Sequence, residues 1–172
     1  MKEMARYGFI LSLICIVAAG FLAGVNSLTK SRIIAQAQAQ EEQSLKEVLP
    51  EGEIFKPIKI NGEIIYYNAF DKTEKLCGVA FKASAKGYSS TIEAMVGMLK
   101  DGTITAVKIL SQNETPGLGT QVAEEKFTGQ FKNRADLSTV QAITGATISS
   151  KAVIDSIEKK AKEIKELIKN GQ

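Results

Sequence analysis

Hydrophobic and polar positions divide the chain into one unbroken apolar run, a series of short strand-like runs and a helical pattern near the end. The apolar run extends from Tyr7 to Leu28 without a charged residue. At about 1.5 Å per residue, it is about long enough to cross a hydrocarbon core of roughly 30 Å. We therefore expect a transmembrane helix at 7–28, preceded by a short N-terminus at 1–6.

A cleaved signal peptide is a second interpretation of this run, because Ala35-Gln36-Ala37 resembles a small-residue cleavage site. We favour an uncleaved anchor, since the apolar part of a signal peptide usually covers only about 7–15 residues. Lys2 and Arg6 precede the run, and Lys30 and Arg32 follow it. The positive-inside rule therefore leaves both orientations open.

The next segment, 29–50, is rich in Ala, Gln and Glu, which favour a helix. This linker helix is expected to continue to about Leu49, because Pro50 and Gly52 follow it. A single domain is then expected at 51–172.

Five apolar runs in that domain are separated by turn signals, of which Asn61-Gly62 and Asp101-Gly102 are typical of tight hairpins. They predict an antiparallel sheet. The expected strands are residues 53–60, 63–70, 76–85, 92–99 and 103–110.

Two helical patterns follow the strands, a shorter one at 121–131 and a longer one from Ser149, with Gly171 as the expected stop. The apolar positions of the longer pattern are Val153, Ile154, Ile157, Ala161, Ile164 and Ile168. Strands followed by helices predict an α+β fold.

Composition narrows the function classes. The chain is 44% hydrophobic and 24% charged, which is typical of a folded protein. Beyond Arg32 the basic and acidic residues are equal in number, so nothing indicates nucleic-acid binding. Histidine is absent, which excludes imidazole base catalysis and histidine-ligated zinc. Cys15 and Cys77 are interpreted as small apolar residues, so we expect neither a metal site nor a catalytic residue.

The loop Gln112–Thr120 follows the last expected strand and contains Pro116, Gly117 and Gly119. Proline fixes its own backbone, and glycine permits a close approach by another group. Such a loop is either a stiff turn or a shelf for a ligand. Considered alone, the turn is the better interpretation.

The tetrad Thr144-Gly145-Ala146-Thr147 stands before the last expected helix. Thr147 or Ser149 would cap that helix in one explanation. In the other explanation the free amides and the positive end of the helix dipole bind a phosphate, and a threonine hydroxyl is esterified by it.

Two stretches behind one membrane helix together resemble the flavin-binding G subunit of the Rnf electron-transport complex. These stretches are DGTITAVKILSQNETPGLGT at 101–120 and VQAITGATISSKAV at 140–153. They also resemble the related C subunit of the sodium-pumping NADH:quinone oxidoreductase. Because this chain is short for the latter, the Rnf family is favoured.

The resemblance implies FMN bound covalently, through its phosphate, to Thr147. A flavin transferase would attach it with FAD as the donor, and Thr144, Gly145 and Ala146 would form the recognition pattern and phosphate pocket. Glu114, Thr115, Leu118 and Gly119 are expected to border the isoalloxazine ring or ribityl chain, and Tyr88 and Ser89 to close the other side. Gln141 departs from the family, which has an acidic residue three positions before the tetrad.

The resemblance also implies an electron relay between ferredoxin and NAD, coupled to sodium or proton movement, with the other subunits of the complex as partners. The family places this domain on the outer, periplasmic or extracellular, face of the cytoplasmic membrane, which implies a cytoplasmic N-terminus at 1–6. A flavin-free, membrane-anchored adaptor is an alternative, and Gln141 favours it.

Overall fold

Helix α1 (Lys2–Val48) begins the structure, a computed structural model that describes residues 2–170. The chain divides into two compact units, Met1–Glu41 and Glu42–Gln172. In the first unit the apolar side chains of α1 are exposed, and α1 is the one helix in 2–170 long and apolar enough to cross a membrane. The expected helix stop at Gly171 lies outside the described residues.

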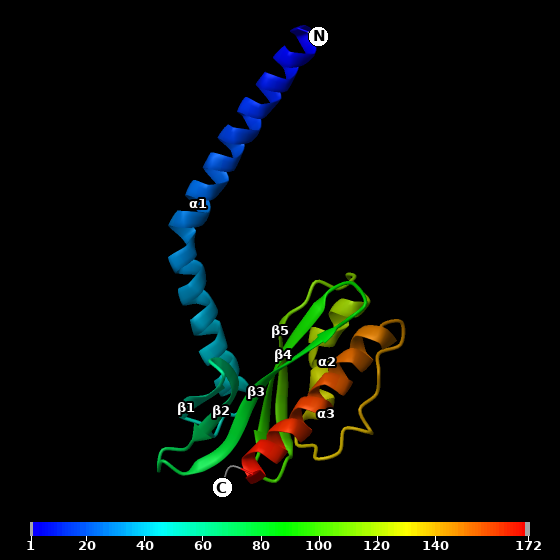
Figure 1. Ribbon diagram of the computed structural model, residues 1–172. Coiled ribbons are helices and arrows are strands. Elements are labelled where there is room, and N and C mark those ends of the chain that lie inside the picture. The colour runs from blue at the N-terminus through cyan, green and yellow to red at the C-terminus, as the bar shows by residue number, and fades with distance from the viewer. Residues whose placement is uncertain (1, 171–172) are drawn as a thin grey trace. The chain divides into compact units, whose positions relative to one another are not determined.

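The second unit is built on a five-stranded antiparallel sheet in the order β1-β2-β3-β4-β5 (Figure 1). Each strand pairs with its neighbour in the sequence, so short hairpin turns connect the sheet. The strands are β1 (Ile54–Ile60), β2 (Glu63–Phe70), β3 (Leu76–Lys86), β4 (Thr91–Leu99) and β5 (Ile104–Ser111). With the helices described below, this sheet confirms the predicted α+β fold.

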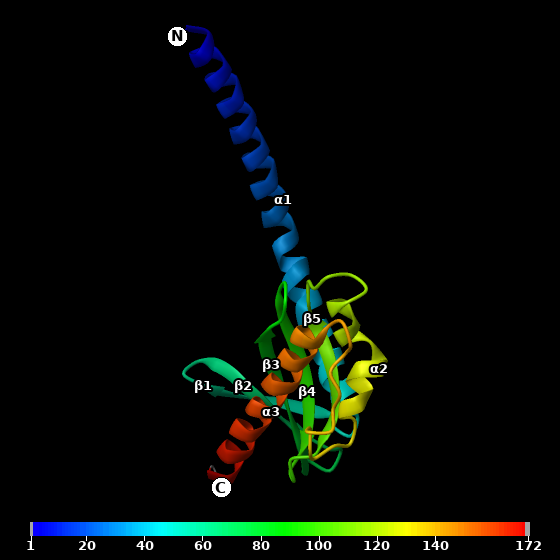
Figure 2. The same ribbon diagram turned by 90° about the vertical axis from the view of Figure 1, so that its right-hand side faces the viewer.

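Helix α3 (Thr147–Asn170) covers one face of the sheet, packing on β3 and β4 (Figures 1 and 2). Its buried residues Val153, Ile157 and Ile164 lie at helical spacing and contact the sheet core. The core on this face includes Phe81 and Val96 from the central strands. The apolar pattern that predicted the helix is therefore the stripe it buries.

The last turns of α1 pack on the opposite face of the sheet. Leu45 and Val48 are buried there with Tyr67, Ala80 and Met95. Burial of these turns explains why the compact unit begins at Glu42, earlier than the expected position 51. The predicted linker helix therefore contributes its final residues to the domain core.

Residues 119–131 form three short turns rather than the single helix expected at 121–131. They are η1 (Gly119–Ala123), α2 (Glu125–Thr128) and η2 (Gly129–Phe131). Val122, Phe127 and Phe131 are all buried. Positions 122 and 127 are five residues apart and would point in different directions on one continuous helix. Breaking the helix allows all three side chains to reach the core.

Both edges of the sheet carry features that limit further strand pairing. Pro57 lies in the middle of the edge strand β1, where it contributes no N–H group. On β5, Ile104 exchanges two backbone hydrogen bonds with Arg134, at 2.7 and 3.1 Å. A connecting segment therefore covers the start of that edge.

Substitution of Gly97 tests the packing of α1 on the sheet. A Cβ atom at Gly97 would collide with the carbonyl oxygen of Val48, while Thr105 Oγ1 already donates a hydrogen bond to that oxygen at 2.5 Å. We expect Gly97→Ala to lower the free energy of unfolding of the full chain in detergent by about 2 kcal/mol, as overpacking does. Urea unfolding followed by circular dichroism measures this change.

Gly129→Ala is the matched control, because Gly129 has a φ of −64° and nothing within 4 Å of an added Cβ. Its effect should stay below about 1 kcal/mol. Equal losses in the two variants would contradict the proposed packing constraint.

Candidate functional site

A pocket of about 490 Å³ lies where the β3–β4 turn, the loop after β5 and the start of α3 meet. All the site residues predicted from the sequence line it except Thr144 and Ser89. Ile148 and Ser149 also line it and were not predicted. Three segments distant in sequence thus converge on one site. The lining residues are Tyr88, Glu114, Thr115, Leu118, Gly119, Gly145, Ala146, Thr147, Ile148 and Ser149.

The loop after β5 is a stiff turn that also forms a wall of the pocket. Leu118 N donates to the Thr115 carbonyl oxygen at 3.2 Å, with Pro116 and Gly117 between them. Gly117 has a φ of +73°, so the four residues match a type II turn, which favours this Pro-Gly pair. The turn predicted from the sequence is confirmed, and the role of this segment as a shelf for a ligand stays a prediction.

The carboxylate of Glu114 joins the three segments. It is only 5% exposed and accepts a hydrogen bond at 2.6 Å from Ser149 Oγ, on α3. The turn between β3 and β4 supplies the other donors, which are Tyr88 N at 3.2 Å, Ser89 N at 3.1 Å, Ser90 N at 2.8 Å and Ser90 Oγ at 3.0 Å. Glu114 lines the pocket, but its oxygen atoms are engaged by the protein.

These hydrogen bonds keep Glu114 ionised. Burial alone would raise its pKa, but the hydrogen bonds from Ser149, Ser90 and Ser89 outweigh burial and lower the pKa from 4.5 to about 2. The site therefore contains a buried negative charge at any physiological pH.

Two glycines make room for this carboxylate. A Cβ at Gly87 would lie 2.7 Å from Glu114 Oε1, and a Cβ at Gly119 would lie 2.7 Å from Oε2. Gly119 therefore accommodates Glu114, and it also lines the pocket. Its expected place beside the flavin stays a prediction.

The tetrad forms a second tight turn beside the first. Ala146 N donates to the Ile143 carbonyl oxygen at 3.0 Å, and Gly145 has a φ of +84°. A Cβ at Gly145 would lie 3.5 Å from Leu118 Cδ2. The two turns are therefore in close proximity on the same side of the pocket.

Helix α3 begins at Thr147 without a cap from either residue expected to supply one. Ser149 Oγ donates to Glu114, and the Thr147 hydroxyl makes no hydrogen bond within the described residues. The first intrahelical donor is Ser150 N, which bonds the Ala146 carbonyl oxygen at 3.0 Å. The amides of residues 147–149 precede it and are unpaired in the helix, as helix N-termini require.

The mouth of the pocket is apolar. Tyr88, Leu118 and Ile148 are 70%, 47% and 59% exposed, respectively, and each comes from a different segment. Thr147 is also exposed. An exposed hydroxyl and an apolar rim thus share one opening to solvent.

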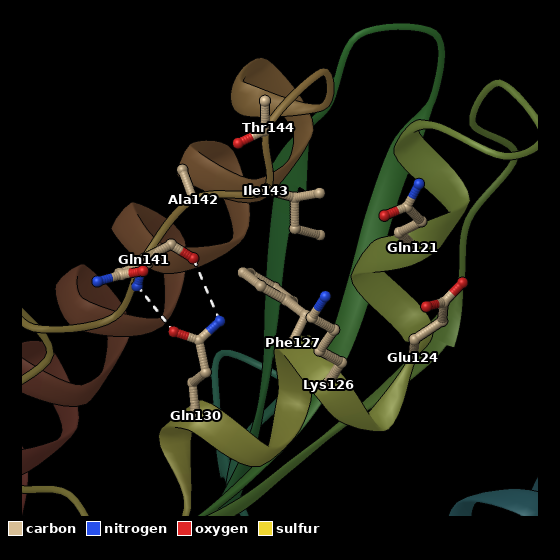
Figure 3. A pocket seen from close by; sticks show the side chains of 9 residues that line it. All are labelled: Gln121, Glu124, Lys126, Phe127, Gln130, Gln141, Ala142, Ile143 and Thr144. Carbon is tan, nitrogen blue, oxygen red and sulfur yellow. Dashed lines mark hydrogen bonds between the residues drawn. The ribbon is translucent and has the colours of Figure 1, made fainter.

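Thr144 faces a different pocket, of about 320 Å³, together with Gln141 (Figure 3). Gln130 fixes the backbone of Gln141 in this pocket: Gln141 N donates to Oε1 at 2.9 Å and Nε2 donates to the Gln141 carbonyl oxygen at 3.3 Å. The two threonines of the tetrad therefore line different pockets. Ser89, the other predicted residue outside the first pocket, contacts it through its bond to Glu114.

Ser149 could have been found from the sequence. It lies four positions before Val153, on the stripe of α3 that faces the sheet. A hydroxyl at such a position needs a buried partner. The identity of that partner, Glu114, has no local signal, because 35 residues separate them.

The pocket lies within a part of the chain that matches a known domain family. The model of the FMN-binding domain family matches residues 87–162, which include every residue that lines the pocket, and a model of the RnfG N-terminal region matches residues 1–48. With its apolar helix α1, the chain is a membrane-anchored flavin-binding protein. It belongs to the RnfG family, the G subunits of ion-translocating oxidoreductase complexes, as predicted.

Relatives along most of the chain support this assignment. The G subunit of the proton-translocating ferredoxin:NAD(+) oxidoreductase complex of Clostridium ljungdahlii is 35% identical over 90% of this chain and 88% of its own length. The G subunit of the Na(+)-translocating complex of Acetobacterium woodii is 30% identical over 91% and 89%. The crystal structure of Shewanella oneidensis NqrC shares the fold, with a TM-score of 0.51 and 21% identity over 64% of this chain and 66% of that one.

The ionisation of Glu114 predicts a pH dependence of stability. A carboxyl group whose pKa is lowered by folding stabilises the protein above its unfolded pKa, and the effect is lost as pH falls through the folded pKa. At about 1.4 kcal/mol per pKa unit, the change from 4.5 to about 2 corresponds to roughly 3 kcal/mol. This contribution should disappear between about pH 5 and about pH 2.

Urea unfolding of the full chain across that range measures the effect. In Glu114→Gln the unfolding free energy should fall by roughly 3 kcal/mol less than in the unsubstituted chain, because the amide does not titrate. Parallel pH profiles for the two proteins would show that Glu114 is not the responsible group.

Proposed function

We propose that this chain carries FMN through a phosphoester to Thr147 and serves as an electron relay in an Rnf-type complex that couples ferredoxin and NAD to sodium or proton translocation. The observation that carries the proposal is the position of Thr147. Its exposed, unbonded hydroxyl lies at the opening of the pocket and at the unpaired N-terminus of α3. The relatives named as G subunits of such complexes support the rest.

The start of α3 suits the phosphate of FMN. Unpaired amides and the positive end of the helix dipole favour a negative group, and α3 is long enough to have a full dipole. Gly145 and the small side chain of Ala146 leave the approach clear. The residues present therefore fit the group that the family binds.

Attachment requires a balanced transfer reaction. The Thr147 oxygen forms a bond to the phosphorus atom of the FMN half of FAD, and the pyrophosphate bond breaks. AMP leaves, and the hydroxyl proton goes to a base of the transferase. In this chain the role of Thr147 is to present an accessible hydroxyl, because no basic side chain lines the described pocket.

The pocket walls position the ring system. Bound FMN supplies the one- and two-electron chemistry, and the protein supplies position and electrostatics. Leu118 and Ile148 offer apolar surface to the ring, and Tyr88 closes the opposite side. The floor of the pocket is formed by Thr115, at the start of the stiff turn, and Gly119, directly after it. An exposed rim keeps the site within reach of electron-transfer partners.

Anchoring and partners follow from the family. Helix α1 holds the chain at the membrane, which raises the effective concentration of the domain near the other subunits. The family resemblance implies the cytoplasmic membrane, with the domain on its outer face. A flavin transferase is the partner during maturation.

Substitution of Thr147 tests the attachment. We expect Thr147→Val to abolish covalent flavin, because valine keeps the shape of the side chain and removes the hydroxyl. The measurement is in-gel fluorescence of the denatured full chain after co-expression with its flavin transferase, followed by mass spectrometry of the peptide containing Thr147. Thermal unfolding should change little, since the hydroxyl makes no hydrogen bond among the described residues.

Thr144→Val is the matched control, because Thr144 faces the other pocket. It should keep covalent flavin. The flavinylated fraction should be lower if the transferase recognises the whole tetrad. Fluorescence retained by Thr147→Val would refute attachment at this residue. An unmodified native chain in the presence of an active transferase would instead favour the flavin-free adaptor.

A further inference from the structure

Glu114 is the only side chain with a formal charge among the described residues that line the flavin pocket. Tyr88 is the other titratable group in the lining. Lys86 and Lys151 belong to the flanking segments, but both are exposed and outside the lining. The electrostatics of the pocket therefore depend strongly on one carboxylate and on the start of α3.

The carboxylate cannot easily move away from the pocket. Three backbone amides and two hydroxyls donate to its oxygens, and Gly87 and Gly119 pack against it. It is almost fully buried, so solvent and salt screen it less than a surface charge. A charge fixed in this way acts on any group that enters the pocket.

We propose that Glu114 sets the reduction potential of the flavin by holding a fixed negative charge in the pocket wall. The inference rests on the proposed function, because it needs FMN at this site. Flavin that takes up two electrons and one proton is anionic at N1, whereas a second proton makes it neutral. Iron–sulfur proteins or an electrode can supply the electrons.

A nearby negative charge disfavours the anionic reduced form. The potential is therefore lowered, and the reduced flavin keeps its second proton to higher pH. A flavin of lower potential is a stronger donor to the next carrier. Glu114 is a positioning and tuning residue, since its oxygens bind the protein and not the cofactor.

The test is a spectroelectrochemical titration of the full chain in detergent, flavinylated by its transferase, over a range of pH. We expect Glu114→Gln to shift the reduction equilibrium at least tenfold toward reduced flavin, which is about 30 mV for a two-electron couple. The pH at which the slope of potential against pH changes should also move down.

Ser149→Ala is the matched control. It removes one hydrogen bond from the same network, while three backbone amides and the Ser90 hydroxyl still donate to the carboxylate. The reduction equilibrium of its flavin should change less than threefold. The slope of potential against pH should change at the same pH as in the unsubstituted chain. Glu114→Gln with full flavin and an unchanged potential would overturn the inference. Equal shifts in the two variants would also overturn it, because they would indicate packing and not charge.

The outcomes separate this inference from the proposed function. A native chain that takes up no flavin overturns both. If only Glu114→Gln loses its flavin, the native chain is compared with free FMN. In the native chain, the slope of potential against pH should change at a higher pH than in free FMN. A slope change at the same or lower pH than in free FMN contradicts the tuning role.

Discussion

The buried carboxylate of Glu114 is the interaction on which the arrangement of the site depends. A single side chain satisfies donors from the β3–β4 turn and from the first turn of α3, while it belongs to the loop after β5. Removing a partner from such a network leaves buried polar groups unsatisfied, which costs more than the bond itself contributes. The three pocket walls are therefore coupled through Glu114, the one side chain that contacts all of them.

Local signals in the sequence were sufficient for much of this fold. Asn61-Gly62 and Asp101-Gly102 marked hairpins that the sheet contains, and the stripe at Val153, Ile157 and Ile164 marked the face of α3. The short turns at 119–131 were mistaken for one helix. Their conformation is set by where the sheet core accepts Val122, Phe127 and Phe131, and that placement has no local signature.

The site was less accessible to sequence reasoning than the fold. The motifs indicated which residues gather, but not their roles. The close approach of Glu114 to Gly119 was not expected, and the helix caps expected at Thr147 and Ser149 are absent from the described contacts. The role of Ser149 depends on a contact with Glu114, 35 residues away in the sequence, and a single sequence carries no record of such a contact. Family resemblance indicated the cofactor, and the structure shows which of the motif residues line one pocket.

Pro57 has a consequence for the chain before it meets its partners. Exposed edge strands invite pairing between copies, which leads to aggregation. On β1 the proline removes a hydrogen-bond donor, and Lys56 and Lys59 add charge on either side of it. A newly made copy is thereby protected from stacking on its neighbours along this edge. The addition of a further strand at β1 is therefore disfavoured.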